Sequence, residues 1–323
     1  MIDDATTEWR PTATRATLER RAQMLHRART FFAQRQVLEV DTPLVVNAPV
    51  TDVHIHSARV ALSNSAAGYF FHTSPEYAMK RLLAAGSGDI FQICHVVRGF
   101  ERGRLHNCEF TLIEWYRCGF SLDQLMSEVE KLVRELLGSA ARDAEHLTYR
   151  DAFLRHLKFD PFVATRAELA EVARGFGFAA NSSTPRDELL EFLMGTRVGP
   201  QLGLNGLAFV RGYPASQAAL ARIDPADART AQRFELYCDG IELANGFHEL
   251  ASAAEQRARF ESDREERQRL ELPSHDLDER LLAALESGLP DCAGVALGFD
   301  RLVMLATGAR TIDEVLAFAT ERA

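Results

Sequence analysis

Cysteine is scarce in this sequence and never occurs in closely spaced pairs. Five cysteines are scattered through 323 residues, and no two of them are separated by only two positions. Cysteine-bound zinc sites need closely spaced ligands, and small disulfide-stapled domains use cysteines in even numbers. The pattern therefore predicts reduced thiols, as in the cytoplasm, and argues against a zinc site.

The sequence also lacks a long apolar run and a secretory start. No stretch of about 18 consecutive apolar residues occurs, so no membrane-spanning helix is expected. The segment Met1–Ala5 has neither a basic nor an apolar character, so no signal peptide is expected either. These absences predict a cytoplasmic protein with no membrane partner.

Positive charge is in the minority, because the formal net charge is −9. Proteins that bind nucleic acid stably usually present a basic surface, so stable tRNA binding is not expected. Only residues 1–35 are locally basic, with seven arginines against four acidic residues. This segment is either a solvated helix face or a docking surface for an acidic partner.

The hydrophobic pattern predicts a mainly antiparallel sheet flanked by helices. Apolar residues recur at helical spacing over 14–36, and the alternating segment 37–43 ends at a proline, as strands do. Ser74 and Pro75 favour a helix start, with Ser74 as the cap. Asp239-Gly240 indicates a hairpin turn. Further strands are predicted at 90–97, 110–116, 234–237, 241–247 and 294–298.

Residues 140–230 differ from the rest of the chain. They show short helical patterns and turn signals but no evident chemistry. The prediction is therefore a single α+β catalytic domain over residues 1–323, with a helical insertion at about 140–230.

Two segments carry residue types suited to a nucleotide. Arg98 ends one predicted strand, and Phe110 opens the returning strand after a polar loop. An arginine can grip a phosphate with a fork of N–H groups, and an aromatic ring can stack on a base. In the second segment, small residues alternate over 294–298, and Arg301 follows in a first helical turn, where anions are favoured. Taken alone, Arg98 also fits a surface charge and Phe110 a core ring.

A third segment combines two carboxylates with an amide. Glu242 and Glu249 lie seven residues apart, and Asn245 lies between them. Magnesium binds carboxylates together with phosphate oxygens. We expect a β-bulge at Gly246 to bring both carboxylates to one Mg²⁺ ion. The alternative is a salt-bridged strand edge.

Together these segments resemble the signature motifs of class II aminoacyl-tRNA synthetases. Residues 96–116 resemble motif 2, residues 294–302 resemble motif 3, and residues 31–43 resemble motif 1, which forms the dimer in that family. The resemblance implies a homodimer. The apolar surface expected near its interface is formed by Phe31, Phe32, Val37 and Leu38.

Within class II, the lysyl branch is the most similar, on residues 73–76, 106–111 and 245–250. Only about 30 residues precede motif 1, fewer than a domain needs, so an anticodon-binding domain is not expected. Residues 214–218 resemble truncated lysyl-tRNA synthetase paralogues, and Ala296 stands where lysyl-tRNA synthetases usually have glycine.

This resemblance implies an ATP-dependent ligase. Such an enzyme adenylates (R)-β-lysine and transfers it to the ε-amine of a lysine on elongation factor P. Two alternatives remain open. One is an enzyme that charges tRNA with lysine, and the other is a catalytically inactive regulatory paralogue.

The resemblance also implies roles for individual residues. Arg98 would contact the α-phosphate and the substrate carboxylate, Arg301 would contact the γ-phosphate, and both would be catalytic. Glu242 and Glu249 would share Mg²⁺. The contacts to the lysine substrate would come from Ser74, Pro75, Glu76, Tyr116, Glu249 and Ala296. The contacts to ATP would come from Arg98, Gly99, Phe100, Asn107, Phe110, Glu242, Leu243, Gly298 and Arg301.

One position departs from the family pattern. Motif 2 usually reads Arg-x-Glu, but Phe100 takes the third position here and Glu101 follows it. The family glutamate helps to read the adenine amino group. Either Glu101 or a backbone group replaces it, or adenine recognition is altered. ATP is still expected as the nucleotide.

Overall fold

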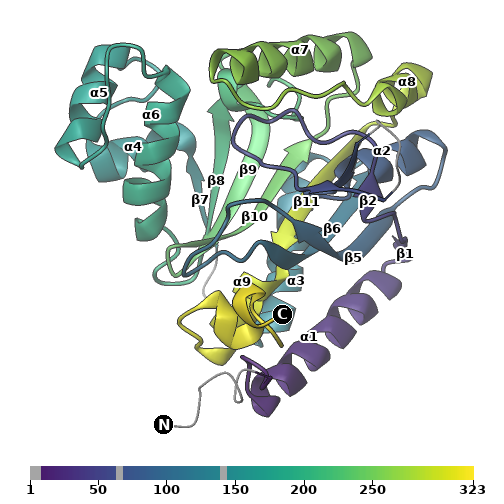
Figure 1. The fold of residues 1–323 in the computed structure, drawn as a ribbon. Helices are drawn as coiled ribbons and strands as arrows, with labels where there is room; N and C mark the ends of the chain where they lie inside the picture. Colours follow the sequence, from purple (N-terminus) through teal and green to yellow (C-terminus); the bar gives the residue numbers. More distant parts are fainter. Residues whose placement is uncertain (1–8, 63–67, 139–143) are drawn as a thin grey trace. The chain divides into compact units, whose positions relative to one another are not determined.

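The computed structural model describes residues 9–62, 68–138 and 144–323 (Figure 1). Contacts divide the chain into two compact units. Unit 1 comprises residues 1–120, 131–139 and 251–323, and unit 2 comprises residues 121–130 and 140–250. The first eight residues of the locally basic segment and the expected start of the insertion near residue 140 lie outside the described residues.

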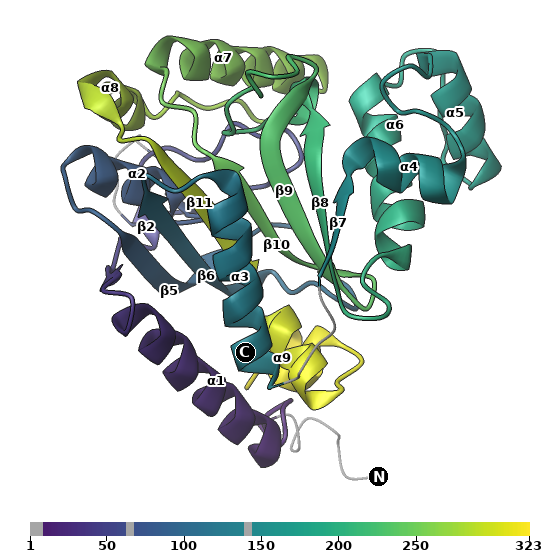
Figure 2. The same ribbon diagram turned by 180° about the vertical axis from the view of Figure 1, so that it is seen from behind.

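Unit 1 is built on strands in the order β1-β5-β6-β11 (Figure 2). β1 (Leu38–Glu39) runs parallel to β5 (Ile90–Val97). β6 (Glu109–Cys118) is antiparallel both to β5 and to β11 (Cys292–Gly298). A small antiparallel sheet in the same unit contains β2 (Val45–Val46), β4 (Tyr69–Phe71) and β3 (Arg59–Val60), in that order.

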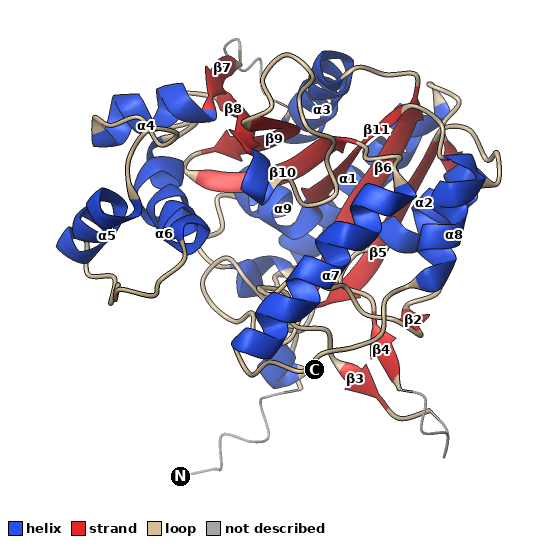
Figure 3. Cartoon of the chain, turned by 90° about the horizontal axis from the view of Figure 1, so that it is seen from above, coloured by secondary structure: helices blue, strands red, loops and turns tan. Residues whose placement is uncertain are grey.

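Helices accompany these strands in unit 1. They are α1 (Arg15–Ala33), α2 (Glu76–Ala84), α7 (Ala253–Arg269), α8 (Glu279–Gly288) and α9 (Phe299–Thr307). α8 packs against α2 and α7 (Figure 3). α3 (Leu122–Leu137) begins in unit 2 and ends in unit 1. Two 3₁₀ turns, Ile312–Val315 and Thr320–Arg322, follow near the end of the chain.

The end of α1 contributes to the apolar core of unit 1. Phe31 and Phe32 are fully buried, and the Phe32 ring stacks on Phe91 with the ring centres 4.3 Å apart. Val37 is also buried, whereas Leu38 is 55% exposed. The prediction that these residues supply interface surface is therefore wrong for Phe31, Phe32 and Val37. Their burial within the chain leaves only Leu38 on the surface.

α2 begins one residue later than the sequence pattern predicts. Pro75 is the N-cap rather than the first helical residue, and the helix starts at Glu76. The Ser74 hydroxyl nevertheless accepts a hydrogen bond from the Glu76 amide at 3.1 Å. Ser74 therefore satisfies a helix-end amide, as a cap would, from a position one residue farther out.

Unit 2 is built on strands in the order β10-β9-β8-β7. β7 (Glu145–Thr148) runs parallel to β8 (Leu207–Pro214), and antiparallel pairing continues through β9 (Thr230–Cys238) to β10 (Ile241–His248). Asp239 and Gly240 join β9 to β10 with φ angles of 49° and 71°. Positive φ at both positions is the hairpin geometry that Asp-Gly favours. The predominance of antiparallel pairing in both units confirms the predicted α+β class.

The predicted insertion contains helices, as expected, but also strands. Its helices are α4 (Tyr149–Leu157), α5 (Arg166–Gly175) and α6 (Arg186–Leu193), followed by a π-helical turn at Met194–Val198 and 3₁₀ turns at Gly199–Gln201 and Ala215–Gln217. A core that includes Tyr149, Phe153 and Tyr213 joins them. β7 and β8 also fall within 140–230 and were not predicted, because short buried strands resemble short helical segments in sequence.

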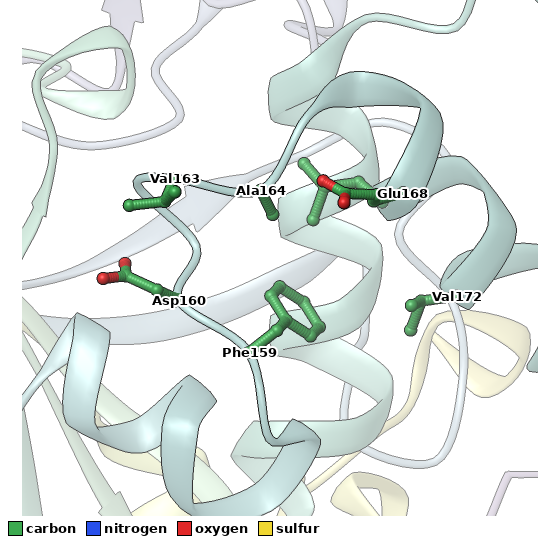
Figure 4. Close-up of a pocket in the computed structure, with 7 residues that line it drawn as sticks. Phe159, Asp160, Val163, Ala164, Glu168 and Val172 are labelled. Carbon is green, nitrogen blue, oxygen red and sulfur yellow. The ribbon is translucent and has the colours of Figure 1, made fainter.

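The insertion also contains a cavity of about 360 Å³, lined by the loop that follows α4 and by α5 (Figure 4). Its lining is mainly apolar and includes Phe159 and Val172. The Asp160 carboxylate at this cavity is ion-paired with Arg150 at 2.6 Å, and Glu168 belongs to the capping box of α5. Both carboxylates therefore already have structural roles.

Candidate active site

A buried carboxylate, Glu114, connects two predicted substrate contacts of unit 1. Only 1% of the surface of Glu114 is exposed to solvent. The Ser74 hydroxyl donates to one carboxylate oxygen at 2.6 Å, and the Tyr116 hydroxyl donates to the other at 2.8 Å. The structure thus brings Ser74 and Tyr116 together. Glu114 was not predicted, although a glutamate between Ile113 and Trp115 in a buried strand is a visible signal.

Ala296 lies beside Glu114 on the neighbouring strand. The β6–β11 register sets Ala296 directly opposite Glu114, and the β5–β6 register sets Gln92 opposite the same residue. Directly opposite residues point to the same face of a sheet. The Ala296 methyl, the Glu114 carboxylate and the Gln92 amide therefore share a face. Ala296 therefore lies close to two other predicted substrate contacts, Ser74 and Tyr116, through their shared partner Glu114. Its own contact with the substrate stays a prediction.

Glu76 already has a cationic partner within its own helix. Its carboxylate lies 2.8 Å from the ammonium of Lys80, one turn later in α2. Lys80 is 1% exposed, and a buried ammonium requires a counter-ion. Lys80 thus fixes the orientation of the carboxylate that is predicted to face the substrate ammonium. Lys80 was not predicted, and the role of Glu76 stays a prediction.

Arg98 and Phe110, two of the motif 2 residues expected to contact ATP, lie together. The Arg98 guanidinium lies 5.1 Å from the centre of the Phe110 ring and donates from Nε to the Thr73 carbonyl at 3.3 Å. The Glu101 carboxylate lies 4.0 Å from the same guanidinium. A guanidinium, an aromatic ring and a carboxylate therefore form one cluster, and their contacts to ATP stay predictions.

Arg301 contacts the loop between β5 and β6. It donates from Nε to the Leu105 carbonyl at 3.3 Å, and its Nη2 lies 2.7 Å from Nε2 of His106. Desolvation, followed by the charges of Arg301 and Arg98, lowers the pKa of His106 from 6.5 to about 4. The ring is neutral at pH 7, so its nitrogen accepts the hydrogen bond from Arg301. His106 was not predicted and lies near both predicted catalytic arginines.

The side chain of Phe100 is not brought to this cluster. Phe100 is 89% exposed, has φ of +64°, and meets the His56 ring edge-on with centres 5.3 Å apart. Positive φ is unusual for a bulky residue. Gly99 precedes it and donates its amide to the His56 carbonyl at 2.7 Å. This turn directs Phe100 outward, while Glu101 lies near Arg98.

Asn107 and Gly298 are held by contacts within unit 1. The Asn107 amide donates to the Glu109 carbonyl at 2.7 Å, and its oxygen accepts from the Thr320 hydroxyl at 2.9 Å. Asn107 is 3% exposed, so it ties the loop to the end of the chain. Gly298 is the N-cap of α9 and lies opposite Leu112 on β6. Their contacts to ATP stay predictions.

A β-bulge determines which residues of β10 share a face in unit 2. Glu242 lies opposite Tyr237 and Asn245 lies opposite Glu235, with the register shifting between Glu242 and Ala244. Tyr237 and Glu235 are two residues apart on β9 and so point to the same face. The extra residue therefore places Glu242 and Asn245 on one face as well.

The bulge also accounts for the odd spacing of the two predicted magnesium ligands. In a regular strand, residues seven positions apart point to opposite faces, so Glu242 and Glu249 would be separated. The one extra residue of the bulge returns both carboxylates to the same face. The bulge was expected at Gly246, but the extra residue is Leu243. The Leu243 side chain is buried in the core, so any contact with ATP would come from its backbone.

A buried polar network supports the same face of unit 2. The Glu235 carboxylate accepts hydrogen bonds from the hydroxyls of Tyr213 at 2.6 Å and Tyr237 at 2.5 Å, and it pairs with Arg233 at 2.7 Å. Arg233 also donates to the Asn245 side-chain oxygen at 3.2 Å. Burial raises the pKa of both tyrosines, so both hydroxyls remain donors. The network fixes the orientation of Asn245.

Glu242 and Glu249 suit a magnesium ion that also binds water and phosphate, rather than a metal ion held entirely by protein side chains. In the part of the chain that the structure describes, no three histidine, cysteine or acidic side chains gather as a metal cage. Magnesium does not need one, because it keeps water ligands and binds one or two carboxylates with phosphate oxygens. Glu242 and Glu249 fit that requirement as a predicted pair.

Comparison with known proteins identifies the family of this chain. The family model described as tRNA synthetases class II (D, K and N) matches residues 3–322. The chain belongs to this class II synthetase family. Relatives from Pectobacterium carotovorum and Edwardsiella ictaluri are 48% and 49% identical, over 98% of this chain and 99% and 98% of their own lengths. A Klebsiella pneumoniae relative is 47% identical over 98% of this chain. All three are named elongation factor P–(R)-β-lysine ligase.

Membership of the class II synthetase family implies that the chain uses ATP. The ligase names of the relatives agree with that nucleotide. Within residues 9–62, 68–138 and 144–323, no helix has the length and apolar character needed to cross a membrane.

Proposed function

We propose that this chain adenylates (R)-β-lysine with ATP and transfers it to the ε-amine of a lysine on elongation factor P. The observation that carries the proposal is near-complete alignment with ligases of that name, at 47–49% identity over 98% of this chain. The short basic segment and the net charge of −9 give no support to stable tRNA binding.

The first step joins the substrate carboxylate to the α-phosphorus of ATP, and pyrophosphate leaves. Negative charge grows on the phosphate oxygens, so cationic groups placed beforehand lower the barrier. Arg98 and Arg301 supply that charge in the proposal, and His106 keeps Arg301 oriented through its neutral ring. Magnesium, held by Glu242 and Glu249, would neutralise further phosphate charge.

The second step transfers the acyl group to a lysine amine of the protein substrate. The amine attacks the acyl carbon, the bond to the adenylate oxygen breaks, and AMP leaves. A free lysine amine has a pKa of about 10.4, so it must lose its proton on entering the site. Glu114 and Glu76 place two carboxylates in the predicted amino-acid pocket, where they suit the ammonium groups of a lysine-type substrate.

Adenylation is tested by exchange of labelled pyrophosphate into ATP. We expect exchange that depends on (R)-β-lysine and on Mg²⁺, and weaker exchange with α-lysine. Free glutamate, used in place of lysine as a control substrate, should support no exchange. Absence of exchange with every lysine isomer would contradict the proposed activity.

We also propose a homodimer with Leu38 at its interface. β1 is at the end of the strand order in unit 1, and Leu38 is a large apolar side chain left 55% exposed there. Leu38→Asp should convert the dimer to a monomer in sedimentation, because it buries an unpaired charge. Leu62→Asp is the matched control, since Leu62 is similarly exposed (61%) but follows β3, a strand of the other sheet. A wild-type monomer at micromolar concentration, with full activity, would refute the dimer.

The pH behaviour of His106 follows from its lowered pKa. In the free enzyme, an NMR titration should show the ring protonating near pH 4 rather than near 6.5. Because the unfolded chain protonates this histidine first, its contribution favours unfolding increasingly as the pH falls from 6.5 toward 4. Bound ATP should raise the pKa, since phosphates oppose the charges of Arg98 and Arg301. A free-enzyme pKa near 6.5 would contradict both the burial of the His106 ring and its position beside Arg301.

A further inference from the structure

A buried ion pair in unit 1 joins α1 to both ATP-binding motifs. Arg21, on α1, pairs through Nη1 with the Asp300 carboxylate and donates from Nη2 to the Thr111 hydroxyl at 2.7 Å. The other oxygen of Asp300 accepts from the Thr111 amide at 2.6 Å. The side chains of Arg21 and Asp300 are only 16% and 2% exposed. The three residues thus form a closed, well-shielded network.

Two of these three residues are chain neighbours of predicted ATP contacts. Asp300 precedes Arg301, and Thr111 follows Phe110. Consecutive Cα atoms are about 3.8 Å apart, so a shift of Asp300 or Thr111 displaces its neighbour as well. The Arg21 guanidinium also lies 5.0 Å from the Phe299 ring, at the start of α9. Arg21 therefore restrains the two segments at one point.

Stability alone gives little reason for such a pair. Removing two charges from water costs free energy, and well-packed apolar replacements of buried ion pairs are often neutral or stabilising. What the pair does supply is fixed geometry, because Asp300 binds Arg21 and the Thr111 amide simultaneously. We propose that Arg21 is a positioning residue for ATP, which holds the Phe110 platform and Arg301 at the separation that the nucleotide requires. This inference rests on the proposed ATP site.

The test compares Arg21→Met with Arg20→Met. Arg20 is the adjacent residue on α1 and donates to the Leu136 carbonyl at 3.1 Å, so its loss controls for general damage to the helix. Arg21→Met should weaken direct ATP binding and raise KM for ATP by about 10- to 100-fold, the scale of a misplaced contact group. KM for (R)-β-lysine should stay unchanged. Arg20→Met should leave both constants near wild type.

Arg21→Lys keeps the test decisive if Arg21→Met does not fold. Lysine retains a charge for Asp300 but lacks the planar fork that also reaches Thr111. It should give an intermediate KM for ATP. Wild-type ATP binding in Arg21→Lys, or an equal rise in both KM values in Arg21→Met, would overturn the inference. ATP binding is measured directly, so the two proposals can fail separately. A wild-type enzyme that binds ATP but does not activate (R)-β-lysine would contradict the proposed function and not the role of Arg21.

Discussion

Replacing Arg98 or Arg301 by alanine is expected to slow adenylation by about 10²–10³-fold, the effect of losing one preorganised donor to a developing oxyanion. Arg98 lies within 5.1 Å of the Phe110 ring centre, and Arg301 bonds to His106 in the same loop region. In the proposed reaction, each arginine supplies charge where phosphate charge grows. The loss should therefore appear in the single-turnover rate of adenylate formation, measured with saturating ATP.

Arg102→Ala is the matched control for both variants. Arg102 lies in the same loop as Arg98, which is also the loop that Arg301 contacts, and it carries the same charge. Unlike them, it pairs with Glu321 at 2.6 Å and Asp313 at 2.8 Å. Its loss removes a partly exposed ion-pair network and should change the adenylation rate little. Near-normal rates in Arg98→Ala and Arg301→Ala, or an equal loss in Arg102→Ala, would remove the basis for the assigned site.

Ala296→Gly is expected to move the substrate preference from (R)-β-lysine toward α-lysine. Ala296 shares a sheet face with Glu114, so in the proposed amino-acid pocket its methyl would reduce the room on the floor. α-Lysine carries its amine one carbon closer to the carboxylate and would need that room. One methyl group discriminates by about 1–3 kcal/mol, so the ratio of kcat/KM values should change by about 5- to 150-fold.

Ala293→Gly provides the control for this substitution. Ala293 is a fully buried alanine on the same strand, three residues earlier, so its methyl points to the opposite face. Both variants should lose similar stability as strand glycines, by roughly 0.5–1 kcal/mol. Only Ala296→Gly should alter the ratio of the two lysine isomers. An unchanged ratio in that variant would disprove a pocket-floor role for Ala296.

The sequence predicts the segments of the site better than the contacts within it. Arg98 and Phe110 could be paired in advance, because a strand–loop–strand unit returns the chain beside itself. Glu114 and Lys80 were missed, because a polar residue in an apolar pattern does not show which partner will satisfy it. The structure shows these partners to be the Ser74 and Tyr116 hydroxyls for Glu114, and Glu76 for Lys80.

Backbone irregularities were the other limit of prediction. A bulge was required to bring Glu242 and Glu249 to one face, but its location depends on pairing with β9, which the sequence of β10 alone does not determine. Similarly, Phe100 adopts a positive φ that a bulky residue rarely takes, so its outward direction was not predictable. Phe31 and Phe32 were misjudged because a motif resemblance does not show which face of α1 covers the chain's own core.

In the proposed function, this chain attaches (R)-β-lysine to elongation factor P. Intact-mass and peptide mass spectrometry of purified elongation factor P, after incubation with the enzyme, ATP, Mg²⁺ and each lysine isomer, tests it most directly. We expect a mass gain of one lysine residue on a single lysine side chain, greatest with (R)-β-lysine and absent without ATP. An unmodified factor under all conditions, alongside efficient lysylation of tRNA, would contradict it.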